Sequence, residues 1–118
     1  MNQYLLFKSR GALHAVNIED VAGIGGDIGD EAQEVISAAV CFYGDKEEEK
    51  HSIKFGTTIL KVAEVLDLVK FDEIYDKPAF FKNVPINGVG VLEDEIAILL
   101  KLKDIVNHCL KKGENYEW

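Results

Sequence analysis

The stretch NGVGVLEDEIAILLKLKDIV, residues 87–106, contains two apolar segments that are separated by three consecutive acids at 93–95. Valine, isoleucine and leucine dominate both segments, and β-branched residues favour strands. A short polar turn between two such segments predicts a hairpin, with strands over 84–92 and 96–102. Acids at a solvated turn have no apolar surroundings that would raise their pKa for proton transfer. We therefore interpret them as a turn that sets the strand register rather than as catalytic groups.

A second hairpin signal lies near the start of the chain. Apolar segments over 3–9 and 12–17 are separated by Arg10-Gly11, and glycine supplies the positive φ that a two-residue turn needs. Asn17 is suited to cap one helical turn over 18–22, because its side chain can accept a hydrogen bond from a backbone N–H. The start of the chain therefore predicts two paired strands followed by a helical turn.

The middle of the chain predicts further strands. Residues 35–43 are rich in β-formers and residues 51–56 alternate in polarity, so together they predict a hairpin whose tip is the charged segment 44–50. Residues 57–69 begin with dense β-branched side chains and predict a strand, while a bend or a helical turn stays open for their later part. Residues 71–81 have no clear period and contain a proline, which predicts a connection. The expected fold class is mainly β.

One domain is expected. At 118 residues, of which 47% are hydrophobic, the chain has apolar material for one core or for two small barrels that share a wall. Residues 103–112 predict a short closing helix that Gly113 ends. We therefore expect a domain over residues 1–112 and a C-terminal tail over 113–118.

The charge of the chain excludes two classes of partner. Thirteen basic residues are scattered among twenty-one acids, which gives a formal net charge of −8. Nucleic acid and anionic membrane surfaces attract clustered basic residues, so neither is an expected partner. Residues 1–10 contain no secretion signal, and no apolar segment reaches the roughly 18 residues of a spanning helix. A cytoplasmic protein without membrane insertion is expected.

Acids also crowd the predicted tip of the middle hairpin, at Asp45, Glu47, Glu48 and Glu49. Such a run is usually a solvated turn, and this is the favoured interpretation. A contact for a basic partner is the minority interpretation. In neither case do these carboxylates predict catalysis.

The motifs predict no catalytic, cofactor or metal site. The glycine-rich segment 23–29 has Ile28 where a dinucleotide-binding motif needs glycine, and its acids would repel phosphate. The three histidines, His14, His51 and His108, stand alone rather than in the closely spaced pairs of metal sites. No cofactor and no metal is therefore expected.

The two cysteines, Cys41 and Cys109, belong to no ligand-spaced group. Cys41 lies in an apolar run, where a buried thiol that packs as a small hydrophobe is the default interpretation, and a disulfide between the two stays open without support. An enzyme that assembles Cys41, His51 and Asp45 in space is the least supported hypothesis.

Three stretches of the chain resemble CheW-like adaptor domains of bacterial chemotaxis. YLLFKSRGALHAVNIEDVAGI, residues 4–24, is similar to the opening hairpin of that family and its short I-E-x-V segment. ILKVAEVLDLV, residues 59–69, resembles its VDxVxxV strand, and VPINGVGVLEDEIAILLKLKDIV, residues 84–106, resembles its closing element. The three stretches follow the family's order and cover about half of the chain. Ala63 and Lys101 stand where those motifs have aspartate, and the arginine-bearing NLRG segment has no clean counterpart.

The resemblance implies a fold of two small packed β-barrels, of which one can be reduced in this short chain. It implies a non-catalytic signalling adaptor that couples chemoreceptor cytoplasmic tips to a CheA-type histidine kinase through protein–protein contacts. Because the NLRG segment is associated with receptor and kinase contacts, its loss leaves the set of partners open. The oligomeric state is also open.

The residues expected to bind partners lie in two places. Val62, Val65 and Leu66 belong to the apolar stretch 59–69, and Phe80 and Phe81 form an aromatic pair beside a proline. For each of them, packing in the core is the competing interpretation. The alternative function is a small-ligand-binding regulatory β-barrel without a kinase partner, which predicts an apolar internal cavity with a few polar groups.

Overall fold

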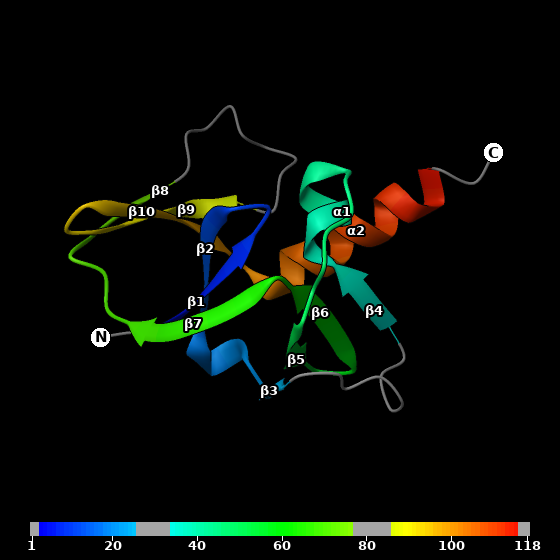
Figure 1. Cartoon of the computed structure of the whole chain (residues 1–118), viewed down its shortest axis with the longest axis horizontal. Coiled ribbons are helices and arrows are strands. Elements are labelled where there is room, and N and C mark those ends of the chain that lie inside the picture. The colour runs from blue at the N-terminus through cyan, green and yellow to red at the C-terminus, as the bar shows by residue number, and fades with distance from the viewer. Residues whose placement is uncertain (1–2, 26–33, 77–85, 116–118) are drawn as a thin grey trace.

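The computed structural model describes residues 3–25, 34–76 and 86–115. Within these ranges the chain forms two β-sheets, two α-helices and one 3-10 turn (Figure 1). The strands are β1 (Tyr4–Ser9), β2 (Ala12–Asn17), β3 (Gly23–Gly25), β4 (Glu34–Ser37), β5 (His51–Phe55), β6 (Thr58–Val62), β7 (Glu64–Val69), β8 (Glu73–Asp76), β9 (Ile86–Leu92) and β10 (Glu95–Leu100). The helical elements are η1 (Ile18–Asp20), α1 (Ala38–Tyr43) and α2 (Leu102–Asn115).

The larger sheet has the strand order β7-β1-β2-β10-β9-β8. Two of the three predicted hairpins, β1–β2 and β9–β10, are confirmed as antiparallel pairs. Arg10 and Gly11 have φ of 52° and 78°, the pair of positive values that a tight two-residue turn requires. The parallel pairing of β2 with β10 joins the two hairpins, so strands from opposite ends of the chain form the centre of one sheet. The predicted helical turn is confirmed as η1, with the Asn17 side chain accepting the Glu19 N–H.

The smaller sheet has the order β3-β5-β6-β4, and it corrects the predicted middle hairpin. The segment 35–43 does not pair with 51–56, because β4 ends at Ser37 and lies parallel to β6. From Ser37 the chain turns into α1, where the Ser37 side chain accepts the N–H of Val40 and Gly44 ends the helix with φ 69°. A serine N-cap and a left-handed glycine at the C-terminus thus outweigh the β-propensity of this segment.

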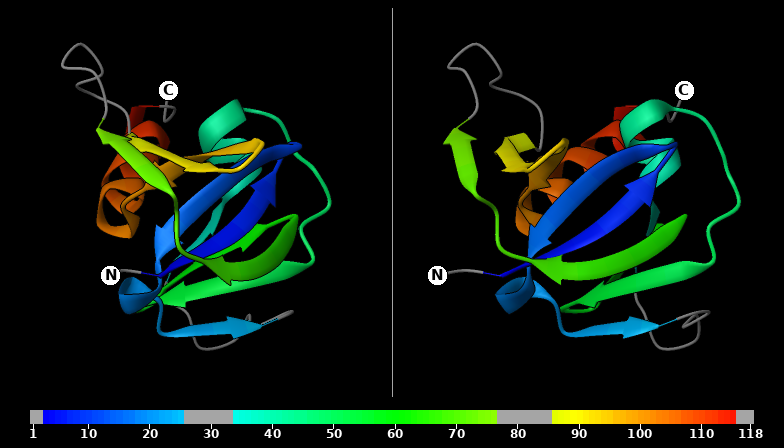
Figure 2. Two further views of the ribbon diagram at one scale, coloured as in Figure 1. Left: turned by 90° about the vertical axis from the view of Figure 1, so that its left-hand side faces the viewer. Right: turned by 60° about the vertical axis from the view of Figure 1, so that its left-hand side comes forward.

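The strand predicted over residues 57–69 is confirmed, and it bends rather than turning helical. It forms β6 in the smaller sheet and β7 in the larger sheet, with Ala63 between them (Figure 2). The N–H of Val65 donates to Nδ1 of His51 on β5, at 2.8 Å. This single segment therefore connects the two sheets covalently and by a hydrogen bond.

Two predicted boundaries were wrong. The predicted connection 71–81 contains the strand β8, which pairs with β9 at the edge of the larger sheet. Edge pairing depends on a neighbouring strand rather than on local propensity, so no local period marks β8. Helix α2 continues past Gly113 to Asn115, since one glycine costs only about 1 kcal/mol in a helix. The division into a domain over 1–112 and a tail stays a prediction, and residues 116–118 lie outside the described ranges.

Two apolar clusters form the core, one on each face of the larger sheet. The main cluster lies between the two sheets and the helices, and includes Phe7, Ile53, Leu60 and Ile105. The second cluster lies on the opposite face and centres on Leu6, Ala15, Ala97 and Leu99. The predicted mainly β architecture of two packed units is confirmed, although among the described strands the two units are open sheets rather than closed barrels.

Candidate docking surface

The residues predicted to bind partners occupy different environments. Val62 has an exposed fraction of 0% and belongs to the main core cluster, so no partner can reach its side chain in this structure. Val65 is partly buried against the same cluster, and Leu66 is partly buried against the second cluster. Phe80 and Phe81 lie outside the described residues. The stretch 59–69 is therefore mainly a structural connection between the sheets.

Exposed apolar side chains instead gather on the β8–β9–β10 part of the larger sheet. Cross-strand partners share one face of a sheet. Tyr75 is paired with Val89 and Val89 with Ile98, while Val91 is paired with Ile96. Tyr75 and Ile96 are 55% and 64% exposed, and the other three are partly exposed. We call these five residues the apolar strip: Tyr75, Val89, Val91, Ile96 and Ile98.

A cavity of about 180 Å³ lies next to the apolar strip, between the sheet and the two helices. Its lining is mostly apolar and includes Ile98 from the strip, with His14, Phe42, Tyr43, Ile86, Leu100 and His108. The strip and the cavity together form a continuous apolar surface, because Ile98 belongs to both. Sequence reasoning missed this surface, since its residues alternate along three strands like those of any half-buried sheet.

His14 is one of the polar residues that line the cavity. Its ring is stacked between the rings of Phe7 and Phe42, with centroid distances of 5.1 and 5.7 Å. Its Nδ1 lies 2.9 Å from the carbonyl oxygen of Ala12 and its Nε2 lies 2.9 Å from the Tyr43 hydroxyl. A carbonyl only accepts, so Nδ1 carries the proton and Nε2 accepts from Tyr43. Burial, and then the Glu47 carboxylate, raises the pKa of Tyr43, so its hydroxyl keeps the proton that it donates.

The stability of the protein is expected to fall as the pH drops from 6.5 towards 4. Burial lowers the pKa of His14 from 6.5 to about 4, against a smaller opposing effect of the Ala12 hydrogen bond. In this pH window the unfolded chain binds a proton at His14 that the folded chain does not. The contribution of neutral His14 is therefore complete above pH 6.5, and about 3 kcal/mol of it is lost by pH 4. Urea unfolding across this range measures the loss.

The control for this prediction is His14→Gln, in which the same pH interval should show a flatter dependence of the unfolding free energy. NMR of the His14 ring then gives the pKa directly. A ring that titrates at its ordinary value in the folded protein would contradict the prediction.

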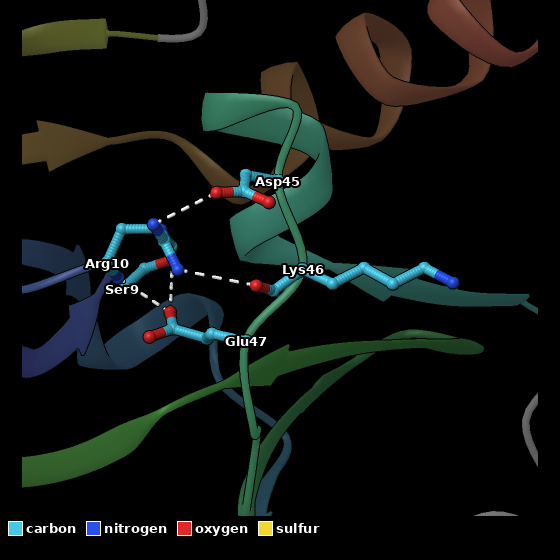
Figure 3. Close-up of polar contacts among 5 residues, drawn as sticks. All are labelled: Ser9, Arg10, Asp45, Lys46 and Glu47. Atoms are coloured by element: carbon cyan, nitrogen blue, oxygen red, sulfur yellow. Dashed lines mark hydrogen bonds and ion pairs between the residues drawn. The ribbon is translucent and has the colours of Figure 1, made fainter.

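The acids predicted to form a hairpin tip instead form an acidic strap, residues 45–49, that crosses the β1–β2 turn (Figure 3). The backbone N–H of Arg10 donates to Glu47 Oε2 at 2.6 Å, and its guanidinium forms an ion pair with Asp45 at 3.0 Å. The Arg10 Nη1 also donates to the Lys46 carbonyl at 3.3 Å. Asp45 keeps an exposed side chain, as the solvated-tip interpretation expects, whereas Glu47 is partly buried and accepts the Arg10 N–H, so that interpretation was wrong for Glu47.

The other end of the strap caps helix α1. Glu49 accepts from the Ser37 hydroxyl at 2.6 Å and from the Ala39 N–H at 3.2 Å. Glu49→Ala is expected to lower the unfolding free energy by about 2 kcal/mol, because hydrogen bonds to a charged acceptor contribute more than neutral ones. Urea denaturation measures this difference.

The matched control is the neighbouring residue. Glu48 is 80% exposed at its side chain and contacts Lys50 only at 3.9 Å, so Glu48→Ala should change stability by less than about 0.5 kcal/mol. Equal losses of unfolding free energy in Glu48→Ala and Glu49→Ala would mean that the acidic strap stabilises the fold through its negative charge alone and not through the hydrogen bonds of Glu49.

The two cysteines form a disulfide. Cys41 on α1 is bonded to Cys109 on α2, and their Cα atoms are 5.6 Å apart. The default interpretation of Cys41 as a free buried thiol was therefore wrong, because the fold brings together two positions that are 68 residues apart. The hypothesis of a catalytic Cys41, His51 and Asp45 group loses its nucleophile, since a disulfide sulfur is not a thiolate.

Two further site classes can be assessed within the described ranges. No group of three or more His, Cys, Asp or Glu side chains there is arranged to hold a metal ion. In the same part of the chain, no helix combines the length and the apolar character that crossing a bilayer requires.

Comparison with known proteins supports the fold. No protein-family model and no curated relative matches the chain. Among solved structures, the scaffolding protein TtCheW from Thermoanaerobacter tengcongensis superposes with a TM-score of 0.71, at 18% sequence identity. The superposition covers 85% of this chain and 88% of that chain. The chain therefore has a CheW-like fold, and the resemblance drawn from the sequence is confirmed at the level of the fold.

Proposed function

We propose that this chain, whose fold is CheW-like, is a non-catalytic signalling adaptor that couples chemoreceptors to a CheA-type histidine kinase in the cytoplasm. The observation that carries the proposal is the likeness over most of both chains to a protein described as a scaffolding protein. The small-ligand alternative is not favoured, because nothing in that likeness points to a ligand-binding regulator.

The apolar strip and its cavity supply the contact surface for this role. Interfaces are built around apolar and aromatic side chains that lose water on binding, and Tyr75 and Ile96 are the most exposed large apolar residues of the described chain. Glu73 pairs with Val91 and so borders the strip on the same face, and the β9–β10 turn adds further acids. The partner segment that fits is apolar with flanking lysine or arginine residues.

Val65 and Leu66 remain proposed as secondary contacts through their exposed parts. An adaptor of this kind acts on a kinase by binding one of its activity states more tightly than another. The apolar strip then contributes by contacting one activity state of the kinase more extensively than the other. The adaptor itself needs to catalyse no reaction.

The test is binding of the purified chain to a CheA-type kinase and to chemoreceptor cytoplasmic fragments encoded in the same genome, measured by calorimetry. We expect Ile96→Glu to weaken binding at least tenfold, because it places a charge at the most exposed side chain of the apolar strip. Val35→Glu is the matched control, since Val35 is 49% exposed on the other sheet and should leave binding unchanged. Circular dichroism checks that both variants are folded.

If the wild-type chain binds neither partner, the adaptor proposal fails and only the fold likeness remains. If it binds and both variants bind equally well, the apolar strip is not the surface that it uses.

A further inference from the structure

A hollow of about 490 Å³ lies where the turn between β5 and β6 meets the start of α2. Its lining includes Thr57 and Thr58, at the end of that turn, and Lys101, Leu102 and Lys103, at the start of the helix. The hollow shares no described residue with the apolar strip or with the cavity beside it. It is therefore a feature separate from the candidate docking surface.

The start of α2 is a positively charged helix end without a side-chain cap. The carbonyl of Lys101 accepts the N–H groups of Asp104 and Ile105, at 2.9 and 3.1 Å, so Lys101 occupies the N-cap position. A lysine side chain has no hydrogen-bond acceptor and cannot cap a helix as serine or aspartate does. Among the described residues, the N–H groups of Leu102 and Lys103 have no acceptor. Lysines at the positive end of the helix dipole are unfavourable unless an anion offsets them.

The side chain of Thr58 is an independent indication that a ligand binds in the hollow. Thr58 is only 6% exposed, and it lines the hollow. Among the described residues its hydroxyl has no hydrogen-bond partner, whereas most buried side-chain polar groups have one. That oxygen is not sealed off from solvent, so a polar group in the hollow can reach it. The hydroxyl is thus a buried donor that is open towards the hollow alone.

The lining of the hollow has a positive balance of charge. Two lysines and one acid, Asp20 of η1, line it, and neither lysine forms an ion pair with a described acid. Asp104 and Glu34, the strand neighbour of Thr58, do not line it. The chain as a whole has a net charge of −8, so the hollow has the opposite sign to the molecule around it. An anion is the class of ligand that this balance favours.

We propose that the hollow is an anion-binding site for a phosphate group, either free or carried by a small molecule as a monoester. The N–H groups at the start of α2 and the Thr58 hydroxyl donate to the phosphate oxygens, and the two lysines supply the countercharge. Phe55 and Val106 also line the hollow and accommodate the carbon part of a monoester. The volume lies within the range of small-molecule sites. The inference goes beyond the proposed function, because the adaptor role holds whether or not this site is filled.

The first test is NMR of backbone amides during titration of the whole chain with inorganic phosphate and, separately, with phenyl phosphate. Chloride keeps the ionic strength constant, because exposed charges respond to salt. We expect saturable shifts at residues 56–58 and 101–104 and no saturable shift in β8, β9 or β10. Tighter binding of phenyl phosphate identifies a monoester as the ligand, and equal binding identifies free phosphate. The absence of a saturable shift with either probe at millimolar concentration, or equal shifts with acetate, overturns the proposal.

The second test uses variants of the lining residues. Thr58→Val should weaken phosphate binding about tenfold, because it removes a hydrogen bond to a charged group, and Thr58→Ser should retain binding. Lys103→Gln should weaken it about threefold, as expected for an exposed charge. Lys70→Gln is the matched control, since Lys70 is exposed between β7 and β8 and does not line the hollow.

Asp20→Asn separates an anion site from a cation site. It should strengthen phosphate binding, because it removes the one acid among the lining residues. Weaker binding in Asp20→Asn, or wild-type binding in Thr58→Val, overturns the proposal. Urea unfolding checks that each variant is folded, and all of these measurements use the chain alone. Their failure is therefore distinct from a failure to bind a kinase or receptor.

Discussion

Phe7→Ala is expected to lower the free energy of unfolding by about 3–5 kcal/mol, the range for removing a large aromatic side chain from a core. Phe7 has an exposed fraction of 0% and lies on β1, which pairs with β2 on one side and β7 on the other. Its ring contacts residues of the main core cluster and stacks on His14 with 12° between the ring planes. The mutation therefore leaves a cavity that the two neighbouring strands cannot close.

The loss should exceed that of a truncation at the surface of the same sheet. Leu68 on β7 is 47% exposed, so Leu68→Ala should cost less than about 1 kcal/mol. Guanidinium or urea unfolding of the two variants gives both numbers, and the denaturant slope shows whether the transition stays two-state. A Phe7→Ala loss as small as that of Leu68→Ala would contradict the placement of Phe7 between the sheets.

Loss of the disulfide is expected to have the second large effect, about 4 kcal/mol. The bridge spans a sequence separation of 68, and crosslinking so long a segment removes much conformational entropy from the unfolded chain. Unfolding is compared between the oxidised protein and Cys41→Ser/Cys109→Ser under the same conditions. The variant should unfold at a clearly lower denaturant concentration.

The reduced wild-type protein separates the covalent contribution from the effect of the serine side chains. If the reduced protein is as stable as the oxidised protein, the bridge does not constrain the unfolded chain, and the expected stabilisation by the disulfide is absent. If it matches the double variant, the entropic account is supported.

The two hairpins were predictable because their signals are local. Arg10-Gly11 adopts the positive φ values that the turn needs, and Glu93 at the second turn has φ 37° with its N–H donated to Asp72. The periodicity of the flanking strands and the composition of the turns act over a few residues, so the chain alone carries this information. The likeness to CheW-like domains rested on these two segments and on residues 59–69, and it held for the fold.

The candidate site was less predictable because exposure is not a local property. Val62 was chosen from an apolar stretch and proved to be core, while Tyr75 and Ile96 carried no distinguishing pattern and proved exposed. The exposure of a side chain depends on which strands and helices pack against its face of the sheet. These elements come from parts of the chain that are far away in sequence. Phe80 and Phe81 lie outside the described residues and stay predictions.

By itself, the sequence determined the mainly β class, the hairpins β1–β2 and β9–β10, the capped turn after Asn17 and the net charge of −8. These depend on φ preferences, short-range periodicity and total charge. Only the tertiary structure decided the parallel pairing of β2 with β10, the edge strand β8, the disulfide and the apolar strip. Each of these depends on two segments that meet only after the chain has folded, because their stabilising contacts are long-range and leave no period in either segment alone.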